Sequence, residues 1–590
     1  MNDILNYYKD ELLLLRQKGR EFAKKYPEIA SAIDIKDGES TDPHTERIIE
    51  SVAFMAARLH QKIEINSEHI AFYILNAIAP NLAAPFPPCS VVSFYSNVGE
   101  PPNNLINIPS RTSISHSTKT GGVSLFRTIY PLDIYPLLIT NVSIERNSLY
   151  SIEQTNGWYI KIDLETNSVP IEGMNCEKIL FHINSNIIED ALIVYEAIFA
   201  NCDTSGVYLK IGDSIIETGE ILPCGFCDNE MACPIKKYSS NIFQLFGEML
   251  NFKQKFMFFE IHGINESIKR SGITDISEIS LIIKTSKPKD RLFQIINKNT
   301  FLLNCTPIVN LFPFTADPFR LTNEKNKYLL LPDQTRNKEL LIHSINSVHY
   351  IDSNTYEDKI IQPYFSLAID SDTNVSHNLF WIYSKNDENS SISFVDTELI
   401  ADKVYDNIIY TKLMCMNKFA SRDIPVLARM DIENLETGGV YATLLYKNTN
   451  PKEVPNNLWA LVSELASTYI SISHGDSLLS SVRKIMDLFS TGAKIKSEEL
   501  ISGISKINSS KVVKRFGSDA WRGFVQGMEY NILCRNEENS YMSFFLGCFI
   551  NQYLSSCISI NSFVQLNLVS EKTNEKMASW EDTSGRKELV

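Results

Sequence analysis

Apolar residues in the first 80 positions repeat at helical spacing. A first helix is predicted over residues 2–26 by the stripe Leu5, Tyr8, Leu12, Leu15 and Phe22. Asp42-Pro43 predicts a restart, because a carboxylate caps free N–H groups and proline needs no N–H at the first helical position. A second helix carries the stripe Ile48, Val52, Met55, Leu59 and Ile63, and a third is predicted over residues 67–79.

Between about residues 86 and 455 the apolar period is mostly two, which is typical of half-buried strands. Residues 158–164 alternate most clearly, and further strands are predicted at 179–183, 206–211, 255–261 and 278–283. Residues 379–383 and 391–395 flank a polar run and predict a hairpin. Two helices interrupt the strands, near residues 188–199 and 242–249.

After Pro455 the period returns to that of helices, over residues 458–472 and 478–489, and the last 80 residues predict strand, helix, strand. The chain is therefore predicted to be an α+β multidomain protein. Pro85, Pro87 and Pro88 mark the clearest boundary. Four segments are expected: a helical segment for bundle formation or partner docking (1–85), a β-rich domain with inserted helices (86–345), a β domain (346–455) and an α+β C-terminal domain (456–590).

Composition excludes several classes of protein. The 590 residues are 44% hydrophobic and 21% charged, which excludes disorder, collagen and coiled coil. A formal charge of -14, from 56 basic and 70 acidic residues, argues against a broad nucleic-acid-binding surface. The uncharged stretches 69–98 and 539–570 contain four prolines and many amide and hydroxyl side chains, respectively, so no membrane span is expected.

The N-terminus and the cysteines predict the compartment. The first residues have no basic region, and Asp10 and Glu11 interrupt any apolar stretch, so we expect no signal peptide. Eleven cysteines without a framework spacing predict reduced, mostly buried thiols in a cytosolic protein.

Motifs for catalysis and metal binding are missing. The chain has no phosphate-binding glycine loop, no H-E-x-x-H and no G-x-S-x-G. Cys224 and Cys227 form a C-x-x-C pair with Cys233 as a possible third ligand, but a closed zinc site needs four, and His262 or Cys202 could be the fourth only by tertiary accident. Buried thiols in a loop are the simpler interpretation.

Other candidate groups have structural explanations. His343 and His349 are spaced too far apart to share a helical face, and no spacing selects a Cys–His pair. A helix cap explains the segment from Asp42 to Arg47. The basic cluster Lys511, Lys514, Arg515 and Arg522 is typical of a solvated face. We therefore expect no catalytic residue, no cofactor and no metal.

Blocks along the whole chain resemble the TssF family (also called VasA or ImpG), a baseplate subunit of the type VI secretion system. The N-terminal block runs from Tyr7-Tyr8 through Tyr26-Pro27 to Asp42-Pro43-His44. The later blocks are Phe126-Arg127-Thr128, Tyr135-Pro136-Leu137, Leu222-Pro223-Cys224-Gly225-Phe226, Lys255-Phe256-Met257-Phe258-Phe259, Leu303-Asn304-Cys305-Thr306-Pro307 with Asn310, Ala316-Asp317-Pro318, Phe380-Trp381, Cys415-Met416-Asn417, Leu458-Trp459-Ala460-Leu461 and Asn561-Ser562-Phe563.

The resemblance implies a structural function. TssF-like proteins form wedges, two copies with one TssG, which join TssK and TssE around the VgrG spike hub and support the contractile sheath. They resemble wedge proteins of contractile phage tails, and they work in the cytoplasm in a baseplate docked at the inner membrane complex. Two other classes stay open: an enzyme with an unrecognised Cys/His site, and a ligand-binding β protein, which a concave aromatic groove would favour.

The N-terminal stripes are the candidate interface. Three helices could bury them in a self-contained bundle, whereas the resemblance implies a bundle shared with TssG and the second TssF copy. The candidate interface residues are Leu5, Tyr8, Leu12, Leu15, Phe22, Ile48, Val52, Met55 and Leu59.

Overall fold

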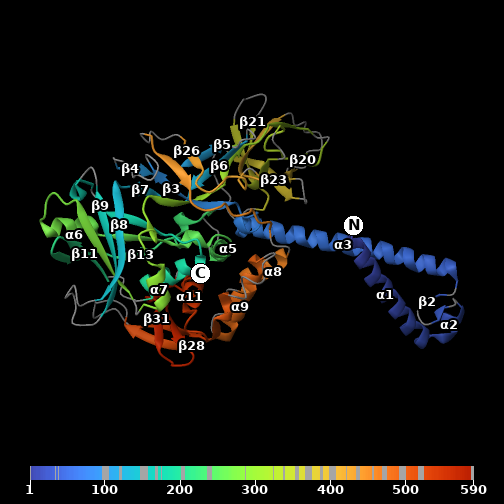
Figure 1. The fold of residues 1–590 in the computed structure, drawn as a ribbon. Coiled ribbons are helices and arrows are strands. Elements are labelled where there is room, and N and C mark those ends of the chain that lie inside the picture. The colour runs from blue at the N-terminus through green and yellow to red at the C-terminus, as the bar shows by residue number, and fades with distance from the viewer. Residues whose placement is uncertain are drawn as a thin grey trace. The chain divides into compact units, whose positions relative to one another are not determined.

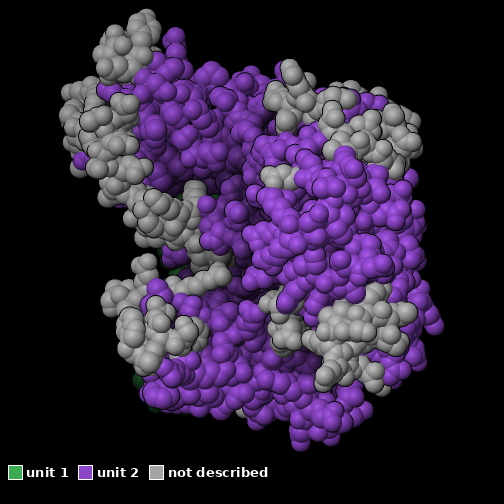
Figure 2. Space-filling view, turned by 90° about the vertical axis from the view of Figure 1, so that its left-hand side faces the viewer, with its two compact units in different colours: residues 1–75, 457–459 green, residues 76–456, 460–590 purple. Residues whose placement is uncertain are grey.

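The computed structural model has an α+β fold with several sheets, as predicted (Figure 1). It describes residues 2–585 except 33–34, 37–38, 41, 96–104, 118–121, 147–156, 167–169, 175, 201–205, 236–241, 286–287, 323–324, 336–338, 352–357, 366–374, 386–389, 398–406, 420, 434–438, 455–456, 468–474, 491–499 and 516–523. The chain forms two compact units, coloured separately in Figure 2: unit 1 holds residues 1–75 and 457–459, and unit 2 holds residues 76–456 and 460–590. The finer division into four segments remains a prediction.

Unit 1 is built on α1 (Asn2–Lys25) and most of α3 (Pro43–Ile78), with α2 (Pro27–Ala32) and the small hairpin of β1 (Ile35–Lys36) and β2 (Glu39–Ser40) between them. The predicted cap is confirmed, because the Asp42 carboxylate accepts hydrogen bonds from the His44 N–H at 3.1 Å and the Thr45 hydroxyl at 2.9 Å. The prediction of a separate third helix over residues 67–79 is wrong. Residues 61–70 contain no proline or glycine, so α3 continues through Ser67.

Unit 2 contains a closed barrel. Its strands come from three distant parts of the chain, and their order round the barrel is β17-β3-β27-β26-β5-β6. The bounds are β3 (Cys89–Tyr95), β5 (Ser113–Ser117), β6 (Val123–Thr128), β17 (Cys305–Val309), β26 (Arg429–Ile432) and β27 (Tyr441–Leu444). Closure needs all three parts, so the barrel joins residues that the sequence pattern assigned to different segments.

Four further sheets extend the barrel region. The small pair is β4 (Ile106–Ile108) with β7 (Leu132–Ile134). A four-stranded sheet has the order β13 (Ile221–Pro223), β14 (Phe258–His262), β10 (Lys178–Ile183), β16 (Phe301–Leu302). A five-stranded sheet has the order β12 (Ser214–Glu217), β11 (Val207–Ile211), β15 (Glu278–Thr285), β9 (Trp158–Thr166), β8 (Leu137–Arg146).

The largest sheet has the order β18 (Phe312–Thr315), β25 (Asn407–Asn417), β21 (Leu340–Ile351), β22 (Asp358–Pro363), β23 (Val375–Lys385), β24 (Ser390–Asp396), β20 (Tyr328–Leu329). In addition, β19 (Phe319–Leu321) pairs with β25.

Most strand predictions are confirmed in these sheets. The predicted hairpin is β23 paired antiparallel with β24, and its turn lies outside the described residues. The strand predicted over 255–261 is wrong at its start, because η5 (Lys253–Phe256) turns the chain there before β14 begins. This turn directs the Lys255 side chain toward Glu248.

Helices pack among and beside these sheets. They are η1 (Pro80–Leu82), η3 (Ile171–Met174), α4 (Ile188–Phe199), η4 (Asp228–Glu230), α5 (Ile242–Asn251), α6 (Ile264–Ser271) and α7 (Asp290–Ile295). The predicted helices after Pro455 are α8 (Leu458–Ser467) and α9 (Gly475–Phe489), and residues 468–472 of the first predicted helix lie outside the described residues.

The C-terminal region confirms the predicted order of strand, helix, strand. It contains β28 (Ile504–Arg515), β29 (Phe524–Cys534), α11 (Ser540–Cys557), β30 (Phe563–Ser570), β31 (Lys576–Ser579) and β32 (Thr583–Ser584). β29 and β30 pair in parallel, which requires a crossover, and α11 supplies it. Most of α11 is buried in protein, which explains its apolar sequence. Across the described chain, no helix combines the length and apolar character needed to cross a membrane.

A buried ion pair holds the loop 224–234 in unit 2. Lys255 and Glu248 have no exposed side-chain area, and the lysine ammonium donates a hydrogen bond to the Glu248 carboxylate. The same ammonium donates to the Gly225 carbonyl at 3.0 Å, and the other carboxylate oxygen accepts from the Ala232 N–H at 3.0 Å. Both buried charges therefore also hold the backbone of the loop, which offsets part of their desolvation cost.

Gly225 shows why this loop has its sequence. Its φ is +102°, and a Cβ there would lie 2.8 Å from the Phe256 ring and 2.9 Å from the Tyr130 hydroxyl. Only glycine allows this close approach, and the Gly225 N–H also donates to the Glu230 carboxylate at 2.7 Å. The Leu-Pro-Cys-Gly-Phe block is thus a structural loop.

Asparagine side chains connect other blocks of the sequence. The Asn310 amide donates to the Asn417 side-chain oxygen at 2.8 Å, and the Asn417 N–H donates to the Asn310 side-chain oxygen at 2.6 Å. Asn304 adopts a left-handed φ of 56°, and its amide bonds both the N–H and the carbonyl of Tyr135, at 3.3 and 3.2 Å. These blocks are spatial neighbours in the core of unit 2.

We predict that the Glu248→Leu variant loses about 3–5 kcal/mol of unfolding free energy, because it leaves the Lys255 charge buried without a partner. The double variant Glu248→Leu, Lys255→Met should recover most of this loss, since neither charge then remains. Urea unfolding followed by circular dichroism measures both. Glu266→Leu is the matched control, because Glu266 pairs with Arg270 at 3.5 Å on the surface, where such pairs contribute below about 1 kcal/mol. A Glu248→Leu variant as stable as this control would contradict the prediction.

Candidate protein-interaction surface

Helices α1 and α3 pack antiparallel in unit 1. The Arg16 guanidinium pairs with Glu46 at 2.7 Å, and Glu11, five residues earlier in α1, lies 3.0 Å from the His60 ring. Tyr7 donates a hydrogen bond to Glu64. The face of α3 that carries these partners also carries Ala53 and Ala57, which are fully buried.

A different face of α3 carries an apolar stripe open to solvent. The stripe comprises Ile48, Val52, Met55, Leu59 and Ile63, which are 64%, 42%, 64%, 62% and 58% exposed. We call it the α3 stripe. Five large apolar side chains at helical spacing form a continuous patch, whereas scattered exposed residues are normal on any protein. An exposed patch of this kind marks an interaction surface.

The predicted residues of α1 divide into two groups. Tyr8, Leu12 and Leu15 are half-buried, whereas Leu5 and Phe22 are 53% and 37% exposed. Part of the predicted stripe of α1 therefore packs inside unit 1, whereas Leu5 and Phe22 are exposed, as are Ile48, Val52, Met55 and Leu59 of α3.

Sequence reasoning missed two exposed leucines on α1. Leu13 and Leu14 are 65% and 49% exposed. The signal was present, because residues 12–15 are four consecutive leucines, and consecutive residues of a helix cannot all face one neighbour.

Trp459 belongs to unit 1 although it lies far along the chain. Its indole N–H donates to the Ser67 carbonyl at 2.9 Å and to the Ser67 hydroxyl at 2.7 Å. Within unit 1, Trp459 of the Leu-Trp-Ala-Leu block thus contacts α3.

The structure does not assemble a metal site from the candidate thiols. Cys224 and Cys233 are buried while Cys227 is exposed, and the His262 ring bonds Glu260 at 2.9 Å. Cys202 lies outside the described residues. Within the described part of the chain, no group of three or more His, Cys, Asp or Glu side chains is placed to hold a metal ion.

Tertiary folding does create one Cys–His pair. The Cys233 thiol lies 3.7 Å from Nε2 of His343, and both residues are buried. Burial raises the pKa of the Cys233 thiol and lowers the pKa of His343 to about 4. A nucleophilic cysteine needs a lowered pKa so that the thiolate forms. Here both groups are held neutral, so the pair has the character of core packing.

The remaining candidate groups have local partners. The His349 ring lies 2.8 Å from the Ser347 hydroxyl, 3.2 Å from Asp358 and stacks on Tyr410. In the basic cluster, Lys514 pairs with Asp582 at 2.7 Å, and Arg522 lies outside the described residues.

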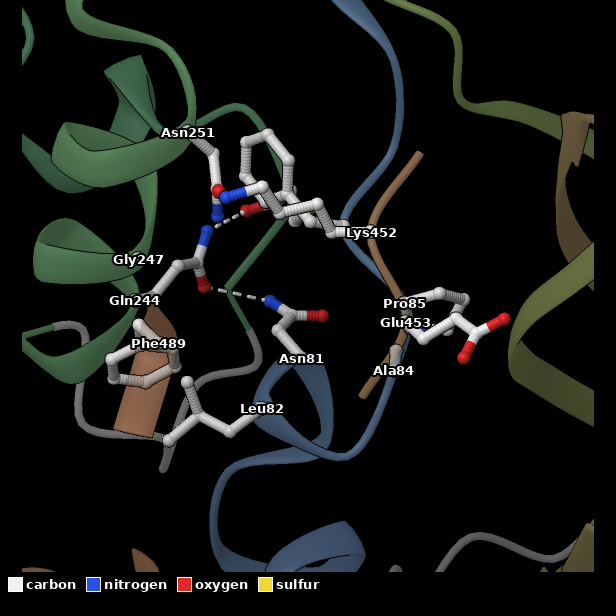
Figure 3. A pocket seen from close by; sticks show the side chains of 12 residues that line it. Asn81, Leu82, Ala84, Pro85, Gln244, Gly247, Asn251, Lys452, Glu453 and Phe489 are labelled. Carbon is white, nitrogen blue, oxygen red and sulfur yellow. Dashed lines mark hydrogen bonds between the residues drawn. The ribbon is translucent and has the colours of Figure 1, made fainter. Parts of the chain in front are cut away.

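A small pocket lies beside η1 in unit 2 (Figure 3). The Asn81 amide donates to the Gln244 side-chain oxygen at 2.9 Å, and the Gln244 amide donates to Glu248 at 2.8 Å. The pocket encloses about 40 Å³, room for a water molecule but not for a substrate. Its polar residues extend the ion-pair network to the chain segment that follows α3.

Solved structures similar to this chain come from type VI secretion. One is a chain of a TssK-TssF-TssG baseplate subcomplex determined by cryo-electron microscopy, with a TM-score of 0.70 and 16% identity over 92% of this chain and 99% of that chain. Another is a chain of the baseplate complex from the type VI secretion system, with a TM-score of 0.55 and 16% identity over 99% of this chain and 100% of that chain.

Sequence comparison agrees with the structural likeness. The type VI secretion system component TssF1 of Pseudomonas aeruginosa is 22% identical over 99% of this chain and 98% of its own length. The family model for type VI secretion system TssF matches residues 1–587. With matched blocks from α1 to β30 and a family match over nearly every residue, the chain belongs to the TssF family of the type VI secretion system.

Proposed function

We propose that this chain is a structural wedge subunit of the baseplate, without catalytic activity, cofactor or metal. Two copies associate with one TssG, and the wedges join TssK and TssE around the VgrG spike hub as a platform for the contractile sheath. The baseplate works in the cytoplasm, docked at the inner membrane complex. A relative of similar fold occurs in a TssK-TssF-TssG subcomplex, which supports the TssG and TssK contacts.

The α3 stripe is the observation that carries this proposal. Five large apolar side chains of one helix are unfavourable in water, because burying each contributes about 1.5–3 kcal/mol of stabilising free energy. Unit 1 packs α1 against a different face of α3, so its own helices leave the α3 stripe uncovered. A shared helical bundle with TssG and a second copy of this chain would bury it. This arrangement replaces the self-contained bundle, which would bury the stripe inside unit 1.

The electrostatics of the interior favour a structural role over an enzyme. The buried Cys233–His343 pair is neutral, and burial raises the pKa of the Cys224 thiol far above its usual value. The buried charges of Glu248 and Lys255 bond each other and the backbone. The titratable groups of this core stabilise the fold.

We predict that Met55→Asp weakens association with TssG by about ten- to hundred-fold, since the interface loses one apolar side chain and gains a buried charge. Co-purification and biolayer interferometry with TssG measure the effect. Gln61→Asp is the matched control, because Gln61 is a partly exposed polar residue on the side of the same helix opposite the α3 stripe. Circular dichroism should be unchanged in both variants. Equal binding of TssG by the two variants would exclude the α3 stripe as the interface.

We also predict that the purified full-length protein holds no stoichiometric metal. Elemental analysis by mass spectrometry tests this directly, with the Cys227→Ser variant for comparison because that thiol is exposed. About one zinc ion per chain, absent from the variant, would establish a site that includes Cys227 and refute the prediction.

A further inference from the structure

A leucine in one loop of unit 2 has a backbone conformation that favours glycine. Leu427 lies between β25 and β26 and has a φ of +65°, in the left-handed region. Four other described residues besides glycine have a positive φ. Three are asparagine or aspartate, which tolerate this region, and the fourth is Arg111, whose guanidinium holds the loop 224–234. Neither explanation applies to Leu427.

Two features of the backbone require the left-handed conformation at Leu427. The Ala428 N–H donates to the Pro425 carbonyl at 3.2 Å, and only Leu427 of the two central residues has a positive φ, which defines a type II turn. The Leu427 N–H donates to the Leu444 carbonyl at 2.8 Å, and the Leu444 N–H donates to the Ala428 carbonyl at 3.1 Å. Two residues thus face one, in a β-bulge of the kind that usually begins with glycine. The turn and the bulge both favour glycine where this chain has leucine.

The side chain of Leu427 contributes little to packing. It is 71% exposed, and the preceding Val426 is 48% exposed. Glycine or asparagine would suit the fold at least as well, with less backbone strain and without apolar surface in water. A residue that violates two local preferences at once is typical of a functional site. A use of this side chain outside the fold explains both violations.

The same loop carries an exposed aromatic ring beside two cations. Phe419 is 52% exposed, and the Lys418 ammonium and the Arg422 guanidinium lie 5.4 and 5.8 Å from its ring centroid. Within the described chain, neither cation forms an ion pair with a carboxylate. Ile424, between the ring and the turn, is 2% exposed and packs in the barrel core, so the loop is anchored.

The charge of this loop indicates the chemistry of its partner. Residues 418–429 include three basic side chains and one acidic side chain, Asp423, whereas the whole chain has a formal charge of -14. Of the basic residues, Arg429 pairs with Asp431 at 3.8 Å, and the other two remain available. Cations beside exposed apolar side chains fit a surface that has carboxylates around an apolar pocket. A two-fold contact between copies of this chain would bring the same cations together, which is unfavourable, so the occupant is a different protein.

We propose that the loop 418–428 is a docking surface for a partner protein whose own surface offers an apolar pocket edged by aspartate or glutamate. Leu427 and Val426 enter the pocket, and the two cations beside Phe419 pair with its carboxylates. The identification of the partner as a baseplate subunit rests on the proposed function.

The test measures binding of co-purified TssK and TssG to the full-length protein by biolayer interferometry. Leu427→Gly and Leu427→Asn should each weaken binding about ten-fold, because both allow the turn and remove the apolar side chain. Leu427→Met keeps an apolar side chain and should bind as the wild type does. Asn574→Gly is the matched control, since Asn574 also has a positive φ, of 56°, and is exposed outside this loop.

The melting temperature separates docking from a role in the fold. The Leu427→Gly variant should melt at the wild-type temperature or above it, because the turn and the bulge both favour glycine. A lower melting temperature would show that the leucine side chain stabilises the fold, and it would overturn the proposal.

Charge reversal tests the chemistry of the partner. The Lys418→Glu, Arg422→Glu double variant should bind about ten-fold more weakly than the wild type at low salt, and the difference should shrink at about 1 M salt, where exposed charges are screened. An unchanged affinity of this variant at low salt would contradict a pocket edged by carboxylates.

The remaining outcomes separate this proposal from the wedge function. If the wild type and every Leu427 variant bind equally, the docking surface is refuted and the wedge function stands. If Leu427→Gly instead abolishes self-association in analytical ultracentrifugation while binding of TssK and TssG is unchanged, the loop contacts a second copy and the proposal is wrong. A wild-type chain that binds neither TssK nor TssG would refute the wedge function and this partner with it.

Discussion

Unit 2 depends on the buried pair of Glu248 and Lys255. Two charges withdrawn from water are tolerable only when each is paired and its remaining hydrogen-bonding capacity is used. Here the lysine bonds the Gly225 carbonyl and the glutamate bonds the Ala232 N–H, so the loop 224–234 cannot shift without exposing a charge to apolar surroundings. Arg111 lies between barrel strands β3 and β5, and its guanidinium donates to the Met231 and Ala232 carbonyls at 2.5 and 2.8 Å, which connects the same loop to the barrel.

The two units distribute polar and apolar groups in opposite ways. Unit 2 places charges and amides in its interior, where the network specifies how distant segments meet. Unit 1 places large apolar side chains in water along the α3 stripe. An interior polar network fixes a single arrangement of the segments of unit 2. The exposed apolar surface of unit 1 allows association with another protein. A subunit that must be rigid in one part and adhesive in another would combine both, which agrees with the proposed role in a wedge.

The blocks that resemble the TssF family are explained by contacts in the core. Asn310 and Asn417 bond each other although 107 positions separate them, and Asn304 bonds Tyr135 across 169 positions. Polar residues in a core are often suspected of catalysis. These amides satisfy backbone and side-chain groups, and the pKa shifts of the neighbouring Cys233 and His343 keep both neutral. Their chemistry is that of fold specification.

The sequence alone determined the local elements. Helical spacing placed α1, α4, α5 and α9, alternation placed β9 and β15, and Asp42-Pro43 placed the start of α3, because these depend on neighbours within one or two turns. The prediction from the sequence was wrong at Ser67, a typical cap residue that lies inside a continuous helix. It was also wrong at Lys255, which forms a tertiary ion pair and lies in a turn where a strand was predicted. Only the tertiary structure decided which strands close the barrel. It also decided which stripe residues of α1 pack inside unit 1 and which are exposed to water, and it brought Cys233 close to His343. Each of these depends on contacts between residues far apart in the chain, and no local pattern records such contacts.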